Sequence, residues 1–427
     1  MDREEVVSVA SPEDVLAYVP HFLGYWPQRS LVVLALRGKQ LGASLRLDLP
    51  DRSASFPEQI RYARNVAGHL SVDDRADGAL LAVYAGIDWR DAADPGYDRL
   101  MFCLAQSLAS AGLPVREAWW VGETKWRDYL CRDASCCPFD GYSLKTVLNS
   151  ALSAELVFRG SCYEPDLAAA MELPETSPAR RAAGRAAFEA AGRGVSLGQP
   201  EAAEFDRALR HWEAALSTED SVPDAVVPDT AVPDTAVPDA VRPDAAASGM
   251  PGAGTSAGGM GQAGRLAVWL CNPHLRDAIL VLALADRSRA AEKGAAELLL
   301  GSPELVPDWP RLARLEAILR QIVALHGIKA VPGTAGSGGV LAEESCSGEP
   351  CSGPTLRGAA VAALTGLGWL EWCRGRGSRA GAHLDAALAL QPGYRLAALF
   401  LQLIESGLLC NWAKNEATAW QRGPEAA

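Results

Sequence analysis

The first 125 residues alternate between strand-like and helix-like patterns of apolar positions. Residues 31–36 form a continuous apolar run, which is typical of a strand buried on both faces. Beyond a turn at 38–40, apolar residues occupy every second position from 41 to 49, so this strand has one dry and one polar face. Further strands are expected at 79–85 and 115–121, and further helices at 56–70 and near 97–111. The alternation predicts a mixed β-sheet flanked by helices.

A helix is also predicted before the first strand. Ser11 offers a hydroxyl cap, Pro12 stands at the first helical position and a carboxylate, Asp14, follows three residues after the cap. We expect Pro20 to end this helix, because proline cannot donate the hydrogen bond that an interior helical position requires.

The last third of the chain has helical patterns alone. Asp308 is predicted to cap a helix whose apolar stripe stops at Gly327. Residues 356–409 contain two predicted helices separated by glycines at 375–377, and a third after Gln391-Pro392. This arrangement predicts an all-α C-terminal domain with a tetratricopeptide-like helical hairpin, present as a single copy and not as a repeat array.

Two low-complexity segments separate these regions. Residues 222–245 repeat a five-residue Val-Pro-Asp unit, and a Gly/Ala-rich stretch continues to residue 264. Proline every fifth residue blocks regular structure, and the aspartates keep the segment hydrated. We therefore predict four parts: an α/β domain at 1–218, a disordered linker at 219–264, a helical domain at 265–415 with a disordered insertion at 332–358, and a flexible tail at 416–427.

Composition narrows the class of protein. The 427 residues carry a formal net charge of −12 and show no obvious run of lysine and arginine, which argues against nucleic-acid binding. The acidic N-terminus does not resemble a signal peptide, and the longest apolar stretches are too short to span a membrane. We therefore expect a cytoplasmic protein whose ten cysteines are mostly thiols or metal ligands.

Several short motifs resemble one known family. They are Pro20-His21-Phe22-Leu23-Gly24-Tyr25-Trp26-Pro27, Arg46-Leu47-Asp48-Leu49-Pro50, Cys136-Cys137-Pro138 with Cys131 and Gly141, and Ser153-Ala154-Glu155-Leu156-Val157 with Gly160. The pattern resembles the actinobacterial domain-of-unknown-function family numbered 4192, and it extends past the linker to Arg276-Asp277 and the closing region at 369–392. The resemblance implies a bacterial cytosolic protein and brings no catalytic residue with it.

A group of cysteines is the strongest candidate for a reactive or metal-binding site in the sequence. Cys131, Cys136 and Cys137 lie close together along the chain, and Cys162 is a candidate fourth ligand, so zinc is a possible cofactor. A redox-active pair and a set of buried thiols remain open alternatives, because structural zinc sites usually show two separate short pairs.

A second candidate site lies on the alternating strand. Ser44, Arg46 and Asp48 share its polar face and would line a crevice at the strand's end, where open α/β sheets often bind ligands, and His21 lies in the family-like turn. The alternative is an edge strand whose charges face water or pair with a neighbouring helix, and a structural role for the histidine.

No known catalytic motif is present, so the function remains a choice between two hypotheses. We expect a non-enzymatic regulatory, ligand-sensing or protein-interaction scaffold, with a protein partner on the helical domain, and with neither nucleic acid nor membrane as partner. The alternative is an enzyme that uses the crevice near Arg46 and Asp48, or a metal on the Cys131–Cys137 loop. The sequence does not determine the substrate, the partner, the oligomeric state or the orientation of the domains.

Overall fold

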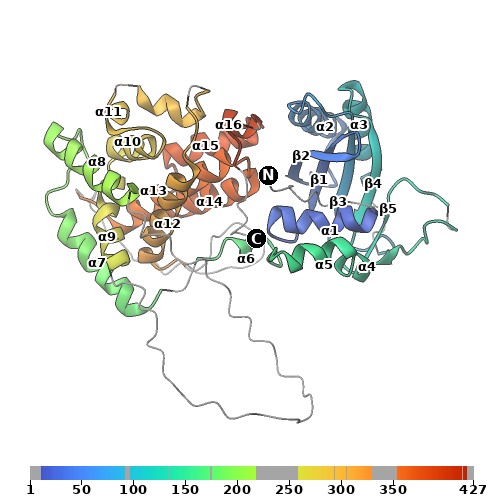
Figure 1. Cartoon of the computed structure of the whole chain (residues 1–427), viewed down its shortest axis with the longest axis horizontal. Coiled ribbons are helices and arrows are strands. Elements are labelled where there is room, and N and C mark those ends of the chain that lie inside the picture. The colour runs from blue at the N-terminus through green and yellow to red at the C-terminus, as the bar shows by residue number, and fades with distance from the viewer. Residues whose placement is uncertain are drawn as a thin grey trace, which may run out of the picture.

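The computed structural model describes residues 11–91, 97–133, 135–173, 176–217, 258–292, 294–303, 305–328, 353–415 and 417–420. These residues form an α/β domain and a helical domain that lie side by side, with the short helix α6 (Leu167–Ala170) between them (Figure 1). Most of the predicted linker and of the predicted insertion falls on 218–257 and 329–352, outside the described residues.

A six-stranded sheet forms the centre of the α/β domain. Its strands are β1 (Ser30–Arg37), β2 (Gln40–Asp48), β3 (Gly78–Tyr84), β4 (Val115–Val121), β5 (Lys125–Asp128) and β6 (Tyr142–Ser143), in the order β2-β1-β3-β4-β5-β6. β3 and β4 pair parallel and the other neighbours pair antiparallel, which confirms the predicted mixed sheet. β2 is an edge strand.

Helices cover both faces of this sheet. α2 (Phe56–Leu70) and α3 (Asp98–Ser110) pack on one face, whereas α1 (Pro12–Leu23) and α4 (Lys145–Leu148) pack on the other, with α5 (Ala151–Phe158) beside α1 (Figure 1). Because successive side chains of a strand point to opposite faces, Trp119 joins the core under α1 and Trp120 joins the core under α2 and α3. The continuous apolar runs therefore serve two cores.

The prediction that Pro20 ends the first helix is wrong. α1 continues to Leu23, and Gly24 caps it with a positive φ of 77°. Proline has no N–H to donate to the carbonyl oxygen of Leu16, four residues earlier. The buried hydroxyl of Tyr84 donates to that oxygen instead, at 3.4 Å. A side chain of the sheet thus satisfies the backbone group that proline leaves without its helical donor.

The second domain is helical throughout its described residues. Its elements are α7 (Pro178–Gly192), α8 (Ala202–Ser217), α9 (Gly258–Leu270), α10 (Pro273–Leu284), α11 (Arg287–Ala290), the 3-10 helix η2 (Ala295–Leu300), α12 (Trp309–His326), α13 (Leu356–Cys373), α14 (Gly377–Leu390), α15 (Arg395–Glu405) and α16 (Asn411–Lys414). Every residue of α13 from Ala359 to Cys373 is buried, so this helix forms the centre of the domain. None of the helices in the described ranges is both long and apolar enough to cross a membrane.

The positions of α7, α8 and the start of α9 differ from the predicted boundaries. The sequence placed α7 and α8 in the α/β domain, whereas Phe188 and Trp212 lie in the core of the helical domain. The sequence placed residues up to 264 in a linker, whereas α9 already begins at Gly258. The reason is a close helix contact: a Cβ added to Gly264 would lie 2.1 Å from the carbonyl oxygen of Gly184 on α7. Glycines that suggest a linker in the sequence serve here to let two helices approach.

The last helices follow the predicted order. α13 packs against α14, and α14 packs against α15, with the expected break at Gly375 and Arg376 between the first two. Trp369 and Trp372 are both buried in the helical core, as expected for residues that share one helix face. The likeness to a tetratricopeptide hairpin stays a prediction.

The role of Tyr84 can be tested by a double-mutant cycle. Tyr84→Phe removes the donor to the Leu16 carbonyl, and we expect the free energy of unfolding to fall by about 1–3 kcal/mol. Pro20→Ala restores a backbone N–H at the helical position, so Tyr84→Phe should cost less in that background. Urea denaturation of the four proteins measures the coupling, and an equal cost in both backgrounds would contradict the proposed substitution of one donor by the other.

Candidate functional site

The two domains contact each other at several places, one of which is the C-terminal end of α1. The Arg379 guanidinium of α14 donates to the carbonyl oxygen of Leu23 at 3.3 Å, and it lies 5.7 Å from the ring centre of Tyr25. A Cβ added to Gly24 would lie 2.9 Å from a terminal nitrogen of Arg379. The left-handed cap of α1 therefore favours glycine for its backbone conformation, and a larger residue there would also push the Arg379 side chain away.

The family-like turn at residues 20–27 also holds the chain segment that leads to the helical domain. His21 is buried, and its Nδ1 lies 3.0 Å from the hydroxyl of Ser161. The ring of His21 makes an edge contact with the ring of Tyr163. The N–H of Trp26 donates to the carbonyl oxygen of Glu164 at 2.8 Å. These contacts favour the structural interpretation of His21, and its predicted ligand role remains untested.

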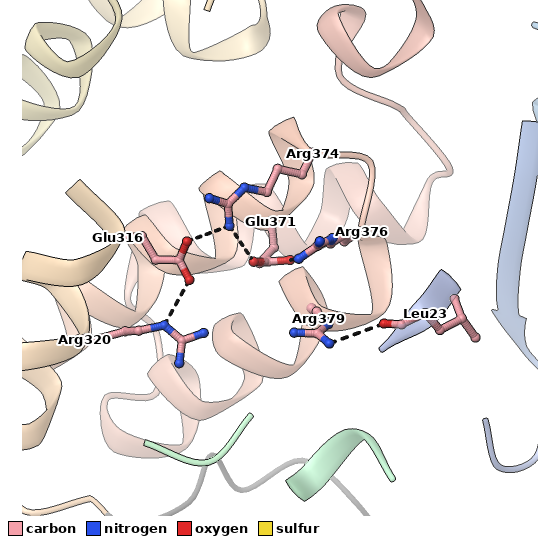
Figure 2. Close-up of polar contacts among 7 residues, drawn as sticks. All are labelled: Leu23, Glu316, Arg320, Glu371, Arg374, Arg376 and Arg379. Carbon is pink, nitrogen blue, oxygen red and sulfur yellow. Dashed lines mark hydrogen bonds and ion pairs between the residues drawn. The ribbon is translucent and has the colours of Figure 1, made fainter. Parts of the chain in front are cut away.

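A cluster of arginines and glutamates, around the buried Glu371 and otherwise partly buried, lies directly behind this contact (Figure 2). Arg374 donates to Glu316 at 2.7 Å and to Glu371 at 3.0 Å, while Arg376 contacts Glu371 at 3.4 Å. Arg320 donates to Glu316 at 2.9 Å from one turn further along α12. The side chains of Glu371 and Arg374 are only 4% and 6% exposed, so these ion pairs are largely shielded from water.

A cavity of about 230 Å³ opens beside this cluster. Three of its lining side chains are cations, Arg374, Arg376 and Arg379, and one is an anion, Glu316. Leu23 and Gly24 complete the wall from the α/β domain. The wall also includes Trp420, whose ring centre lies 4.0 Å from the guanidinium of Arg376. The cavity therefore lies between the two domains, and both contribute to it.

Positive charge exceeds negative charge in this cluster. Four arginines, counting Arg320 and Arg379, face two glutamates. Burial, followed by repulsion from Arg379 and Arg374, lowers the pKa of Arg376 to about 10 against the attraction of Glu371. Burial raises the pKa of Glu316, but Arg374 and Arg320 outweigh this effect and bring it to about 2. The carboxylates are thus firmly ionised, and the arginines still carry an excess of charge.

Two of the arginines retain unused hydrogen-bonding capacity. The Nε atoms of Arg374 and Arg379 are buried and have no hydrogen-bond partner among the described residues. A buried donor without a partner costs free energy, about 1–3 kcal/mol, and more when the group is charged. An oxyanion in the cavity is one acceptor that would suit such donors.

The residues predicted as a ligand site on β2 lie in a network of polar contacts with neighbouring elements. Arg46 donates to the hydroxyls of Ser30 at 2.9 Å and Ser378 at 2.8 Å, and it pairs with Asp48 at 2.8 Å. Asp48 is 82% exposed, and Ser44 is half-buried. Arg46 thus links the edge strand to α14 of the helical domain, and the ligand role of these three residues remains a prediction.

The predicted cysteine ligands come together in part. The sulfur atoms of Cys131, Cys136 and Cys137 all lie within 4.8 Å of one another. Cys162 is exposed after α5 and lies outside this group, so the structure does not bring it in as the fourth thiolate.

Sequence reasoning missed the arginine cluster. Three arginines occur within six residues, at 374, 376 and 379, and the first follows the buried Glu371 by three residues. This local excess of positive charge at a helix break was a usable signal, although the long alanine- and leucine-rich helices around it suggested only packing. Glu316 and Arg320 are separated from it by more than fifty residues, and only the tertiary fold brings them there.

The stability contribution of Glu316 should depend on pH. Because its pKa is lower in the folded state than in the unfolded chain, its contribution is present above about pH 4.5 and is lost as the pH falls toward 2. We expect Glu316→Gln to reduce the free energy of unfolding by about 3 kcal/mol at pH 7 and to narrow this difference between pH 5 and pH 2. Urea titrations across this range measure the effect. The exposed Glu297→Gln serves as a control, and a pH-independent difference for Glu316→Gln would contradict the assignment.

Comparison with known proteins gives a family and no activity. No curated protein and no solved structure matches this chain. Residues 12–409 match one family, and this range includes the turn at 20–27, the cysteine loop and the arginine cluster. The chain therefore belongs to the family described as Domain of unknown function (DUF4192).

Proposed function

We propose that this protein is a cytoplasmic, non-enzymatic sensor that binds a small oxyanion in the arginine-lined cavity between its domains. One observation carries the proposal: Arg374, Arg376 and Arg379 line a cavity whose wall includes the end of α1. A ligand in this cavity would contact both domains. The proposed group is a phosphate or a carboxylate, because both are recognised by planar guanidinium groups.

Charge supports an anionic ligand. Buried ions of one sign require compensation, and the two glutamates of the cluster compensate only part of the charge of the four arginines. The pKa of Arg376 is lowered by burial and by the neighbouring arginines, which shows that positive charge in this cluster is not fully compensated. An oxyanion would reduce this repulsion and accept hydrogen bonds from buried guanidinium nitrogens.

The size of the cavity limits the ligand. Pockets for drug-sized molecules have volumes of roughly 300–1,000 Å³. The cavity of about 230 Å³ therefore fits a small anion or the charged end of a larger metabolite. Trp420 covers part of it and contacts Arg376, so its aromatic ring can exclude water from the bound anion.

The position of the cavity supports sensing. Arg379 both lines it and donates to the carbonyl oxygen of Leu23, so an anion bound between Arg379 and the end of α1 reinforces the contact between the domains. A ligand shifts a conformational equilibrium by its difference in affinity for the two states. The protein partner that we expect on the helical domain would then respond to this arrangement.

Binding of inorganic phosphate and of succinate tests the proposal. Calorimetric titration and thermal unfolding should show saturable binding of at least one of them, with a melting temperature that rises with ligand concentration. Arg376→Gln should weaken binding about tenfold or more, because a hydrogen bond to a charged group contributes roughly 1.5–3 kcal/mol. Phosphate and succinate serve as separate arms that distinguish the two types of anion.

A matched variant controls for charge. Arg395→Gln removes the same charge from an exposed position at the start of α15, and it should bind the anion like the unmodified protein. Hydrogen exchange of residues 20–27 should slow when the anion binds, since the end of α1 forms part of the wall. Equal affinities of the Arg376→Gln and Arg395→Gln variants, or no saturable binding of either anion, would refute the proposed function.

A further inference from the structure

The loop between β5 and β6 carries three cysteines whose sulfur atoms converge. Cys131 follows the end of β5, and Cys136 and Cys137 stand in the turn that leads toward β6. All three sulfur atoms lie within 4.8 Å of one another, and those of Cys136 and Cys137 are 3.8 Å apart. In a tetrahedral site with metal–sulfur distances of about 2.3 Å, neighbouring thiolates are about 3.8 Å apart. The closest pair already has the spacing of two ligands.

Apolar packing does not account for this convergence. Cys103, Cys373 and Cys410 belong to the apolar cores of the described residues, as expected for buried thiols. The three loop cysteines belong to none of these cores. Cys136 is exposed and Cys131 is only half-buried. Cys137 is buried, so the three sulfur atoms meet where the loop passes from the surface into the fold, outside the apolar cores.

Backbone contacts hold the loop in the shape that brings the sulfurs together. The buried guanidinium of Arg127 donates to the carbonyl oxygens of Cys131 at 3.0 Å and Phe139 at 2.9 Å. The N–H groups of Cys136 and Cys137 both donate to the carbonyl oxygen of Asp133, at 3.2 Å and 2.7 Å. The two sides of the loop are thus fixed by the protein itself, which lowers the cost of ordering the ligands on binding.

We propose that Cys131, Cys136 and Cys137 bind one zinc ion through three thiolates. Soft thiolate ligands favour zinc among the common divalent ions, whereas magnesium and calcium prefer oxygen, and the described group consists of three thiols. The exposure of Cys136 leaves the fourth position to a water or to an external ligand. Zinc binding releases the thiol protons to solvent and fixes the loop between β5 and β6. This site is independent of the arginine cavity and of its proposed ligand.

Metal content is the first test. The full chain, purified without an affinity tag and under reducing conditions, should contain about one zinc per chain by elemental mass spectrometry, or take up one on titration. Titration with cobalt(II) should produce thiolate-to-metal charge-transfer absorption and the visible bands of a tetrahedral site. Hydrogen exchange of residues 129–141 should slow when the metal binds.

Two variants and a matched control assign the ligands. Cys136→Ser and Cys131→Ser should lower zinc affinity by more than about 100-fold, since loss of an outer-shell partner alone costs 10–100-fold. Cys162→Ser removes an exposed cysteine of the same domain from outside the group and should leave the affinity unchanged. Because Cys136 is exposed, its serine variant should keep the circular dichroism spectrum of the parent chain.

The opposite outcomes would overturn the proposal. A reduced protein that contains no zinc and develops no cobalt–thiolate absorption has no such site. Retention of parental zinc affinity by both Cys136→Ser and Cys131→Ser shows that the metal lies elsewhere. A disulfide between two of the three cysteines in protein purified under reducing conditions assigns the cluster to redox chemistry instead.

Discussion

The ion pairs of Glu316 and Glu371 with Arg320 of α12 and with Arg374 and Arg376 at the break between α13 and α14 are the interaction on which the rest of the domain contact depends. Charges that are almost fully shielded need partners in good geometry, and breaking one pair leaves another charge uncompensated. Here the glutamates fix Arg374 and Arg376 at the break between α13 and α14, and Arg379 in the first turn of α14 contacts the end of α1. The α/β domain therefore docks on a surface that the ion pairs have already ordered.

The elements on both sides of this contact are held firmly in their own domains, so a few polar contacts suffice to fix how the end of α1 meets α14. The sheet keeps α1 in place through a buried core, and the Tyr84 hydroxyl supports the helix at Pro20, so that its C-terminal end is rigid where it meets Arg379. On the other side, α13 is surrounded by the other helices of its domain and cannot shift easily. Arg46 adds a second link from the edge strand to Ser378. Two rigid bodies thus meet at a few polar contacts, a geometry that a small ligand at the interface can bias.

Prediction from sequence succeeded where local pattern and tertiary environment agree. The strands at 30–37 and 78–84 follow apolar runs, the strand at 115–121 was also expected, and α2 begins and ends where its amphipathic pattern does. Prediction failed at Pro20 because the distant Tyr84 hydroxyl donates to the carbonyl oxygen that proline leaves without a helical donor. It failed at Gly258–Gly264 because a facing helix makes glycine necessary inside a helix there. The candidate site shows the same contrast: the sequence singled out the three clustered cysteines, but it could not bring Glu316 to Arg374.

The sequence by itself determined that the chain has a mixed sheet with flanking helices, a helical second domain and a cysteine-bearing loop, because these follow from periodicity and spacing within short windows. Tertiary structure alone decided that α7 and α8 belong to the helical core and that Arg46 reaches Ser378. It also decided that Arg379 of α14 meets the end of α1. Contacts between residues hundreds of positions apart depend on how whole elements pack, and no local pattern encodes that packing.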